Sequence, residues 1–413
     1  MRIMMTASHG GYDPEQKPIG GGAAVCERLA REWAGRSDLS LTIVDGTHLG
    51  DIIPSSLGEF AYARFCRDFE RLSTKLALDQ RPDVVLCHDV SEGPDFEQLA
   101  RAGIPCVTIF HVDVVSFFCR FYLFGLSPTL ANKAWRCLRA LPWPDVLRLV
   151  FDKQDAAVRF SSRIVLPSPG MVDEISACYR FVSQIDVIPW GAPNVVPAPR
   201  KTNHAPVILV LSRLSPEKGH ELLFDAIEEG EKRDEIPPGL EIVTCGEPAF
   251  MRGPAYAARL KRRAARLRRC TVRFVGHVGG AEKAAHFARA DLFVAPSLYE
   301  SYGLSVIEAM AYGTPVVARR TFGTECVLAG GGGRLIEPGP GEAQRFWAAI
   351  RELLKDDETR SRLAAEARAN ATQHPFSVAA DRLLGVLRQA GDLNRSRVAP
   401  PPGTRWNAST ING

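Results

Sequence analysis

The chain has 413 residues, of which 46% are hydrophobic and 24% charged, and its formal net charge is only +4. These values are ordinary for a globular protein, and so small a net charge does not indicate a nucleic-acid partner. The length exceeds that of one ordinary core, so we expect two domains of about 100–200 residues each. No uncharged apolar stretch approaches the ~18 residues of a membrane-spanning helix, and the N-terminus lacks the apolar core of a signal peptide. We therefore expect a cytoplasmic protein.

Ten cysteines are spread along the chain without a Cys-x-x-Cys pair. Zinc ribbons and disulfide frameworks use closely or regularly spaced cysteines, so this distribution favours neither. We expect reduced, mostly buried thiols.

Short apolar runs alternate with longer helical patterns along the whole chain. Runs of this kind predict parallel strands that are buried on both faces, with helices between them. We therefore expect an α/β protein with two doubly wound, Rossmann-like sheets. The predicted strands of the first half are 2–8, 39–45, 83–89, 105–113, 163–168 and 185–191. Those of the second half are 207–214, 240–246, 271–278, 291–297, 315–319 and 333–337.

The domain boundary is expected near residue 190, because the segment 189–206 contains five prolines and has no helical period. We predict an N-terminal domain over 1–190 and a C-terminal domain over 191–375. The tail 392–413 contains the segment VAPPPGT and is expected to be disordered.

Two segments stand out from this rhythm. Residues 114–161 interleave aromatic side chains with arginines. They are interpreted either as a helical insertion whose aromatics fill the N-terminal core, or as an acceptor pocket or membrane-facing surface. Residues 252–273 are strongly basic. They are interpreted either as the solvated face of a helix that covers a sheet, or as a patch attracted to anionic lipid. No aromatic stacking platform accompanies them, so no nucleic-acid partner is expected.

The strongest functional signal is the segment 291–325. A predicted strand ends at Pro296 and is followed by Glu300, Gly303 and, eight positions after the first glutamate, Glu308. A helix that begins at the carboxyl edge of a parallel sheet presents free N–H groups and a positive dipole end to phosphates. Carboxylates beside it can accept hydrogen bonds from vicinal hydroxyls. The pattern indicates a ligand with both phosphate and hydroxyl groups.

With this spacing, and followed by EAMAYGTPVV, the two glutamates resemble the signature of the retaining glycosyltransferases of family 4, which have the GT-B fold. The segment VILVLSRLSPEKGHELLFDAI, from Val207, is similar to the family's strand, arginine, Lys-Gly pair and helix. The resemblance implies two Rossmann-like domains, an interdomain cleft and a nucleotide-sugar donor held mainly by the C-terminal half. It also implies a last helix, 376–391, that crosses back onto the N-terminal domain.

The same resemblance implies a role for each matching residue. Arg213 and Lys218 would hold the donor diphosphate and stabilise the leaving group as its charge develops. Glu300 would orient the sugar hydroxyls, and Glu308 would hold the ribose. His111 would point at the donor sugar from the end of a buried strand. The implied catalytic residues are His111, Glu300, Arg213 and Lys218. The implied donor-binding residues are Gly21, Gly22, Arg213, Lys218, Gly246, Glu300, Ser301, Tyr302, Gly303, Leu304 and Glu308.

In the N-terminal half, three consecutive glycines open a helix after the first predicted strand. Such a loop lets backbone amides approach a phosphate or an acceptor closely. Asp113 is expected as the partner of His111. The residues expected on the acceptor side of the cleft are His9, Gly20, His88, Asp89 and Asp113.

Three positions depart from the family's pattern. Trp190 stands where the hinge strand usually has Asn, and Tyr302 replaces the commoner Phe. Phe322 replaces the first Gly of the family's Gly-Gly-x-x-Glu loop, in which Glu325 keeps its place.

The predicted activity is transfer of a hexose-type sugar, with retention of configuration, from a UDP- or GDP-sugar. The acceptor is expected to be a saccharide, a lipid-linked molecule or a small natural product, with peripheral membrane contact left open. The chain lacks the Asp-x-Asp motif of metal-binding glycosyltransferases, so metal independence is expected. No cofactor is expected besides the nucleotide-sugar donor, which is a substrate. Two alternatives are a nucleotide-sugar epimerase of the same architecture and a non-catalytic protein that binds sugar nucleotides.

Overall fold

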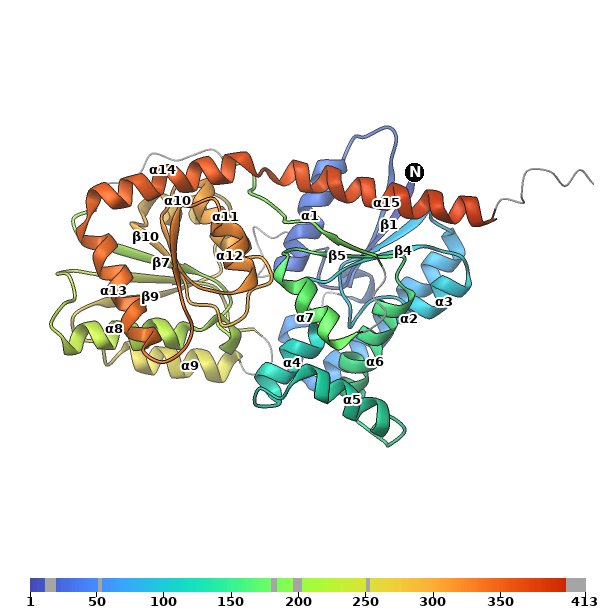
Figure 1. The fold of residues 1–413 in the computed structure, drawn as a ribbon, viewed down its shortest axis with the longest axis horizontal. Helices are drawn as coiled ribbons and strands as arrows, with labels where there is room; N and C mark the ends of the chain where they lie inside the picture. Colours follow the sequence, from blue (N-terminus) through green and yellow to red (C-terminus); the bar gives the residue numbers. More distant parts are fainter. Residues whose placement is uncertain (12–19, 51–53, 180–183, 196–202, 250–252, 399–413) are drawn as a thin grey trace, which may run out of the picture.

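The computed structural model describes residues 1–11, 20–50, 54–179, 184–195, 203–249 and 253–398. They form two α/β halves that lie side by side, each built on a six-stranded sheet (Figure 1). Every strand pairing in both sheets is parallel. The prediction of two doubly wound sheets is confirmed. None of the described helices is long and apolar enough to cross a membrane.

The first sheet has the strand order β2-β1-β3-β4-β5-β6. Its strands are β1 (Arg2–Ala7), β2 (Ser40–Asp45), β3 (Val84–Cys87), β4 (Cys106–Ile109), β5 (Arg163–Leu166) and β6 (Ile185–Val187). Its helices are α1 (Gly21–Trp33), α2 (Glu59–Gln80), α3 (Phe96–Arg101), α4 (Val114–Tyr122), α5 (Pro128–Leu138), α6 (Asp145–Phe160) and α7 (Gly170–Cys178). Two 3-10 turns, Gly46–Leu49 and Pro54–Ser56, precede α2.

The second sheet has the strand order β12-β11-β10-β7-β8-β9. Its strands are β7 (Val207–Leu211), β8 (Glu241–Cys245), β9 (Thr271–Gly276), β10 (Leu292–Ala295), β11 (Val316–Arg319) and β12 (Gly333–Ile336). The helices that follow β7 are α8 (His220–Lys232), α9 (Gly253–Ala264), α10 (Gly280–Arg289), α11 (Leu304–Ala311), α12 (Phe322–Leu328), α13 (Glu342–Lys355), α14 (Asp357–Gln373) and α15 (Phe376–Val398). A 3-10 turn, Pro216–Lys218, precedes α8.

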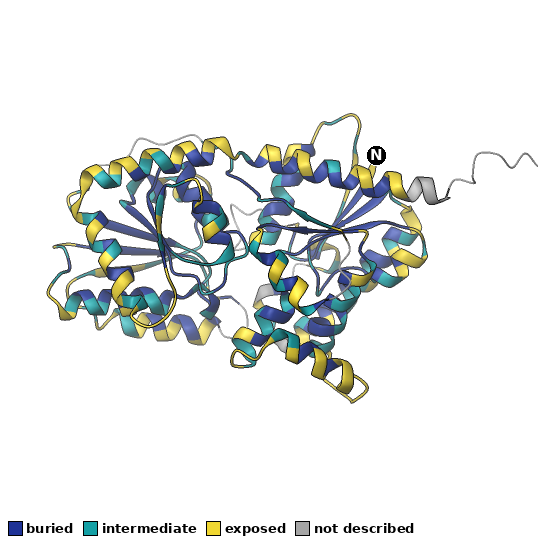
Figure 2. Ribbon diagram, in the orientation of Figure 1, coloured by how far each residue is buried: buried dark blue, intermediate teal, exposed yellow. Residues whose placement is uncertain are grey.

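The central strands are short, and several of them are buried along their whole length. All four residues of β3, β4, β5 and β10 are buried, as Figure 2 shows for both sheets. Strands covered on both faces need apolar side chains at every position, which explains why continuous apolar runs located them correctly. In the first sheet, α1 and α15 cover one face, while α2, α3, α6 and α7 cover the other.

Both sheets reverse their strand order at one point. In the first sheet the reversal lies between β1 and β3, and in the second between β7 and β10. Loops at the carboxyl ends of strands diverge at such a point and leave a crevice that can hold a ligand. The predicted glycine loop and His88 follow β1 and β3, whereas the Arg213 and Glu300 segments follow β7 and β10.

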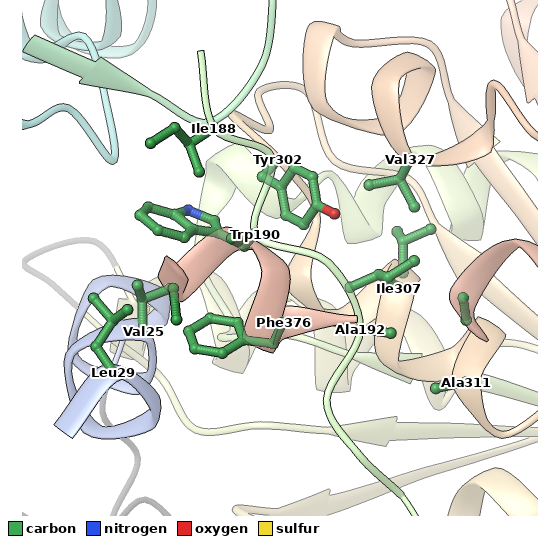
Figure 3. Close-up of a cluster of buried hydrophobic side chains, with 14 of the residues drawn as sticks. Val25, Leu29, Ile188, Trp190, Ala192, Tyr302, Ile307, Ala311, Val327 and Phe376 are labelled. Carbon is green, nitrogen blue, oxygen red and sulfur yellow. The ribbon is translucent and has the colours of Figure 1, made fainter. Parts of the chain in front are cut away.

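The two connections between the halves run side by side. Ala192 N–H donates to His374 O at 2.7 Å, and Phe376 N–H donates to Ala192 O at 2.8 Å. Trp190 is buried at this crossing, and its ring centroid lies 6.3 Å from that of Phe376 (Figure 3). Tyr302 comes from the second half, and its hydroxyl accepts a hydrogen bond from Gly191 N at 2.7 Å. Two of the three positions that depart from the family pattern, 190 and 302, therefore lie together at this crossing.

The last helix is longer than expected. It crosses onto the first half, where it contacts α1, β3 and β4, and it continues past residue 391 to Val398. The expectation of disorder from 392 is therefore wrong for 392–398, where no proline interrupts the helix before Pro400. The remaining tail, 399–413, lies outside the described residues.

The segment 114–161 forms α4, α5 and α6. Part of it is core, because Trp135 stacks on Phe151 with centroids 5.1 Å apart and Phe118 packs edge-on against the same ring. The basic segment also has an explanation within the fold. Arg259 Nη2 lies 2.7 Å from Glu221 Oε1, and Arg263 pairs with Asp225 and Glu228 of α8.

Exchange of Tyr302 for Phe tests the contact at the crossing. Loss of the hydroxyl leaves the buried Gly191 N–H without its acceptor, which should lower the free energy of unfolding by about 1–3 kcal/mol. Denaturant unfolding of Tyr302→Phe beside the wild type measures this. An unchanged free energy would show that the contact does not stabilise the crossing.

Candidate functional site

A cleft of about 510 Å³ lies between the two halves. Its volume is within the ~300–1,000 Å³ of typical ligand pockets. Strand-end loops from both sheets line it. All the predicted site residues except His88 and Asp113 belong to its lining.

The loops after β7 and β10 bring opposite charges together. Lys218 Nζ lies 2.7 Å from Glu300 Oε2, and both side chains are largely buried. Arg213 Nη2 lies 3.4 Å from Glu217 Oε1. The two cations at the positions that hold the diphosphate in the family therefore already contact carboxylates in the free protein. A bound anion would compete with these carboxylates for the same cations.

Two glycines of the site are required by the backbone itself. Gly303 has φ 97° and caps the N-terminus of α11, so a side chain there would be strained. Gly246 has φ 141°, and a Cβ at this position would lie 1.9 Å from Ser212 O. Both glycines bring backbone to the cleft wall. Their conformations explain their identity without reference to a ligand.

Glu308 faces the first half across the cleft. It forms a hydrogen-bonded ion pair with Arg28 of α1, and Lys283 Nζ lies 3.9 Å from its other oxygen. Sequence analysis missed Arg28. The signal that could have found it is helical spacing, because Ala24, Glu27, Arg28 and Arg31 recur on one face after the glycine loop and all line the cleft.

The glycine loop lies close to side chains of both halves. A Cβ on Gly20 would lie 3.6 Å from Arg213 Nη1, and one on Gly21 would lie 3.2 Å from Leu304 Cδ1. A Cβ on Gly22 would lie 3.1 Å from His111 Cδ2. Side chains here would fill the space between the glycine loop and these three residues.

His111 pairs with His88 rather than with a carboxylate. His88 Nδ1 lies 3.2 Å from His111 Nε2, and the rings stack with centroids 5.4 Å apart. Burial lowers the pKa of His111 to about 4. Burial and the neighbouring His111 ring hold the pKa of His88 well below its usual value. Both rings are therefore neutral near pH 7. The expectation that His88 lines the cleft is wrong, because the residue is buried behind His111.

The expectation that Asp113 supports His111 is wrong. Asp113 is fully buried as the N-cap of α4, where it accepts hydrogen bonds from Ser116 N at 3.0 Å and from Gln154 Nε2 at 2.8 Å. N-caps favour aspartate because its carboxylate satisfies the free N–H groups of the first turn. Its own N–H donates to Tyr299 Oη at 3.2 Å, which links α4 to the loop of Glu300.

A buried polar cluster lies on the acceptor side. His9 Nε2 is 3.1 Å from Glu92 Oε1, Tyr62 donates to the same carboxylate, and Asp89 accepts from Ser8 N at 2.6 Å. Burial and the neighbouring Glu92 raise the pKa of Asp89 to about 6. Although burial favours the neutral ring, the hydrogen bond and charge of Glu92 raise the pKa of His9. Hydroxyl groups of a ligand would find both donors and acceptors here.

Within the described ranges, no three His, Cys, Asp or Glu side chains form a group arranged to hold a metal ion.

Comparison of the sequence with known protein families identifies the family to which the chain belongs. Residues 195–370 match the family "Glycosyl transferases group 1". The chain is 34% identical to the glycogen synthase of Mycobacterium tuberculosis over 307 residues, which cover 72% of this chain and 67% of that enzyme. The chain therefore belongs to the group 1 glycosyltransferases.

Other relatives match over a shorter span. The D-inositol 3-phosphate glycosyltransferase of Corynebacterium efficiens is 32% identical over 209 residues, which are 49% of this chain and 48% of that enzyme. The match thus spans about half the length of this relative.

Solved structures share the GT-B fold at low identity. Sucrose-phosphate synthase from Thermosynechococcus elongatus has a TM-score of 0.67 at 17% identity, covering 95% of this chain and 99% of that one. Anabaena Alr3699/HepE, solved in complex with UDP-glucose, has a TM-score of 0.63 at 19% identity and covers 94% and 99%. These neighbours confirm the predicted architecture.

Because the histidine pair is neutral in the folded protein, we predict that the free energy of unfolding falls in acid. The unfolded imidazole of His111 binds a proton near its ordinary pKa of 6.5, while the folded one does so only near 4. The unfolded state therefore holds more protons in this window, and the free energy of unfolding should fall as the pH drops from 6.5 to 4. His111→Asn should have a shallower slope. Histidine-resolved NMR in which His111 titrates near 6.5 would contradict the assignment.

Proposed function

We propose that this protein is a retaining hexosyltransferase that moves a sugar from a UDP- or GDP-sugar to a hydroxyl group of an acceptor. The proposal rests on one observation: Arg213, Lys218, Glu300 and Glu308 converge on one cleft from the segments that follow β7 and β10, the strands that flank the switch point of the second sheet. A uridine nucleotide is favoured, because Anabaena HepE was solved with UDP and with UDP-glucose.

The donor diphosphate is proposed to bind at Lys218 and Arg213. Cations at this position would stabilise the charge that develops on the diphosphate as it leaves. Because Lys218 pairs with Glu300 in the free protein, the diphosphate would compete with Glu300 for that lysine. Glu300 would then accept hydrogen bonds from sugar hydroxyls, and the neutral His111 ring would lie beside the sugar.

Retention would follow from attack on the face that the diphosphate leaves, with a short-lived oxocarbenium ion between the two. The leaving phosphate would take the acceptor proton, so no side chain has to act as a nucleophile. We propose that no metal takes part, in line with the missing Asp-x-Asp motif. The acceptor would bind on the side of His9 and Asp89, and its class stays open among saccharides, lipid-linked molecules and small natural products.

A thermal-shift and calorimetric panel of UDP, GDP, ADP and dTDP sugars tests the donor. We expect stabilisation by one series, by roughly 2.7 kcal/mol at a hundredfold excess over Kd, unchanged by EDTA. Loss of the effect with EDTA would refute metal independence. No stabilisation by any nucleotide would refute the donor site.

Exchanges at the ion pair separate binding from chemistry. Lys218→Ala should weaken nucleoside diphosphate binding and slow transfer together, by about a hundredfold or more. Glu300→Gln should slow transfer but keep or raise nucleoside diphosphate affinity, because the competing carboxylate charge is removed. Steady-state transfer and calorimetry measure both quantities.

Lys232→Ala is the matched control for this pair of exchanges, since Lys232 is an exposed residue at the end of α8 and does not line the cleft. It should leave transfer and affinity unchanged. Wild-type affinity in Lys218→Ala would remove that lysine from the donor site. Epimerisation of the donor without any transfer would favour the alternative enzyme class.

A further inference from the structure

Exposed apolar side chains gather in one short stretch of the first half. Among the described residues, nine large hydrophobic side chains are exposed, and six of them fall between residues 124 and 143. They are Phe124, Leu126, Leu130, Leu138, Leu141 and Trp143. Single exposed apolar residues are normal on a protein surface, but a contiguous group usually marks an interaction site.

The helix α5 at the centre of this stretch is apolar on two faces. Its inner face carries Ala131 and Trp135, which pack against α4 and α6. Its outer face carries Leu130, Ala134, Cys137 and Leu138, all exposed. The spacing of four, seven and eight residues from the first leucine is that of one helical stripe. The core accounts for the inner stripe and leaves the outer one without a partner in the described fold.

The turn between α4 and α5 holds an aromatic side chain out in solvent. Phe124 is fully exposed, and its φ of 52° is a left-handed conformation that bulky residues rarely adopt. Gly125 follows at φ 81°. Packing within the fold does not explain a phenylalanine at this position, because its side chain has no buried contact surface.

The same stretch carries only positive charge. Residues 114–144 contain four cations, Arg120, Lys133, Arg136 and Arg139, and no Asp or Glu. Arg136 reaches Asp155 of α6 at 3.5 Å. Over the described part of the chain, no carboxylate lies within ion-pair distance of Lys133 or Arg139. On the basic helix α9, two of the four cations, Arg259 and Arg263, pair with carboxylates of α8.

We propose that these residues form a docking surface for an anionic lipid bilayer. The surface, here called the α5 face, consists of the turn Phe124–Leu126, the outer stripe of α5 and the turn Leu138–Trp143. An amphipathic helix of this kind lies in the plane of the membrane interface, with apolar side chains among the acyl chains and cations at the lipid phosphates. Tryptophan favours the same interface depth. With 11 residues, α5 is too short to span a bilayer.

Charge decides between a bilayer and a second copy of the chain. A two-fold contact between two α5 faces would place the unneutralised cations of both copies opposite one another, which costs free energy. An anionic lipid surface neutralises them instead. The α5 face lies at the edge of the first half opposite α15 (Figure 1), and Figure 2 shows it as a largely exposed edge.

The α5 face also adjoins the cleft. The helix α4 leads directly into the turn at Phe124, and Phe117 and Tyr122 of α4 line the cleft. A docked molecule would therefore hold the acceptor side of its cleft beside the lipid surface.

Co-sedimentation of the full chain with vesicles tests this docking without donor or acceptor. We expect binding to vesicles of phosphatidylcholine mixed with phosphatidylglycerol and little binding to phosphatidylcholine alone. Lys133→Glu with Arg139→Glu should reduce partitioning by at least roughly fivefold for each cation removed. Leu130→Ser with Leu138→Ser should also reduce it, and both pairs should keep the wild-type Tm because the side chains are exposed.

Two control variants match these exchanges. Arg262→Glu with Arg266→Glu, on the basic helix α9 and the segment after it, matches the charge change, and Val378→Ser on α15 matches the loss of an exposed apolar residue. Both should bind vesicles as the wild type does. The proposal is overturned if the wild type stays in the supernatant with anionic vesicles, or if the controls lose as much binding. It is also overturned if light scattering shows a dimer that Leu130→Ser with Leu138→Ser dissociates while vesicle binding is absent.

Discussion

The arrangement of this molecule depends on one packing constraint, the burial of apolar side chains where the chain crosses twice between its halves. Trp190 and Phe376 occupy this crossing together with Tyr302 (Figure 3), and one hydrophobic cluster runs from α1 and α15 of the first half to α11 of the second. Parallel backbone hydrogen bonds at Ala192 hold the two crossings together. Because this burial fixes how the halves face each other, the carboxyl ends of both sheets open onto a single cleft.

The cleft that results is held by polar contacts that also involve its proposed ligand-binding groups. Glu308 meets Arg28 across the halves, and Tyr299 on the Glu300 loop accepts a hydrogen bond from Asp113 N. Within the second half, Lys218 is paired with Glu300. Charges buried in a cleft need partners to offset desolvation, and in the free protein these charged groups pair with one another. A ligand with phosphates and hydroxyls would exchange these internal pairs for its own.

Two residues that depart from the family pattern, Trp190 and Tyr302, lie at the crossing between the halves. Trp190 removes the polar side chain that is usual at its position, and Tyr302 adds a hydroxyl that is usually absent. The hydroxyl accepts a hydrogen bond from Gly191 N–H, a buried donor at the crossing that would otherwise lack this acceptor. Two exchanges that lie far apart in the sequence thus belong to one buried cluster in the structure.

The sequence by itself determined the class, all twelve strands and the segments that carry the site, because strands buried on both faces need continuous apolar runs and glycines need special backbone angles. Only the tertiary structure decided which side chains meet. Arg28 and Glu308 are 280 residues apart, and no local pattern pairs them. Asp113 follows His111 closely but turns to cap α4, because the free N–H groups of that helix are nearer. The outer stripe of α5 is apolar, as are Ala131 and Trp135 on its inner face, and packing alone decided which stripe stayed exposed.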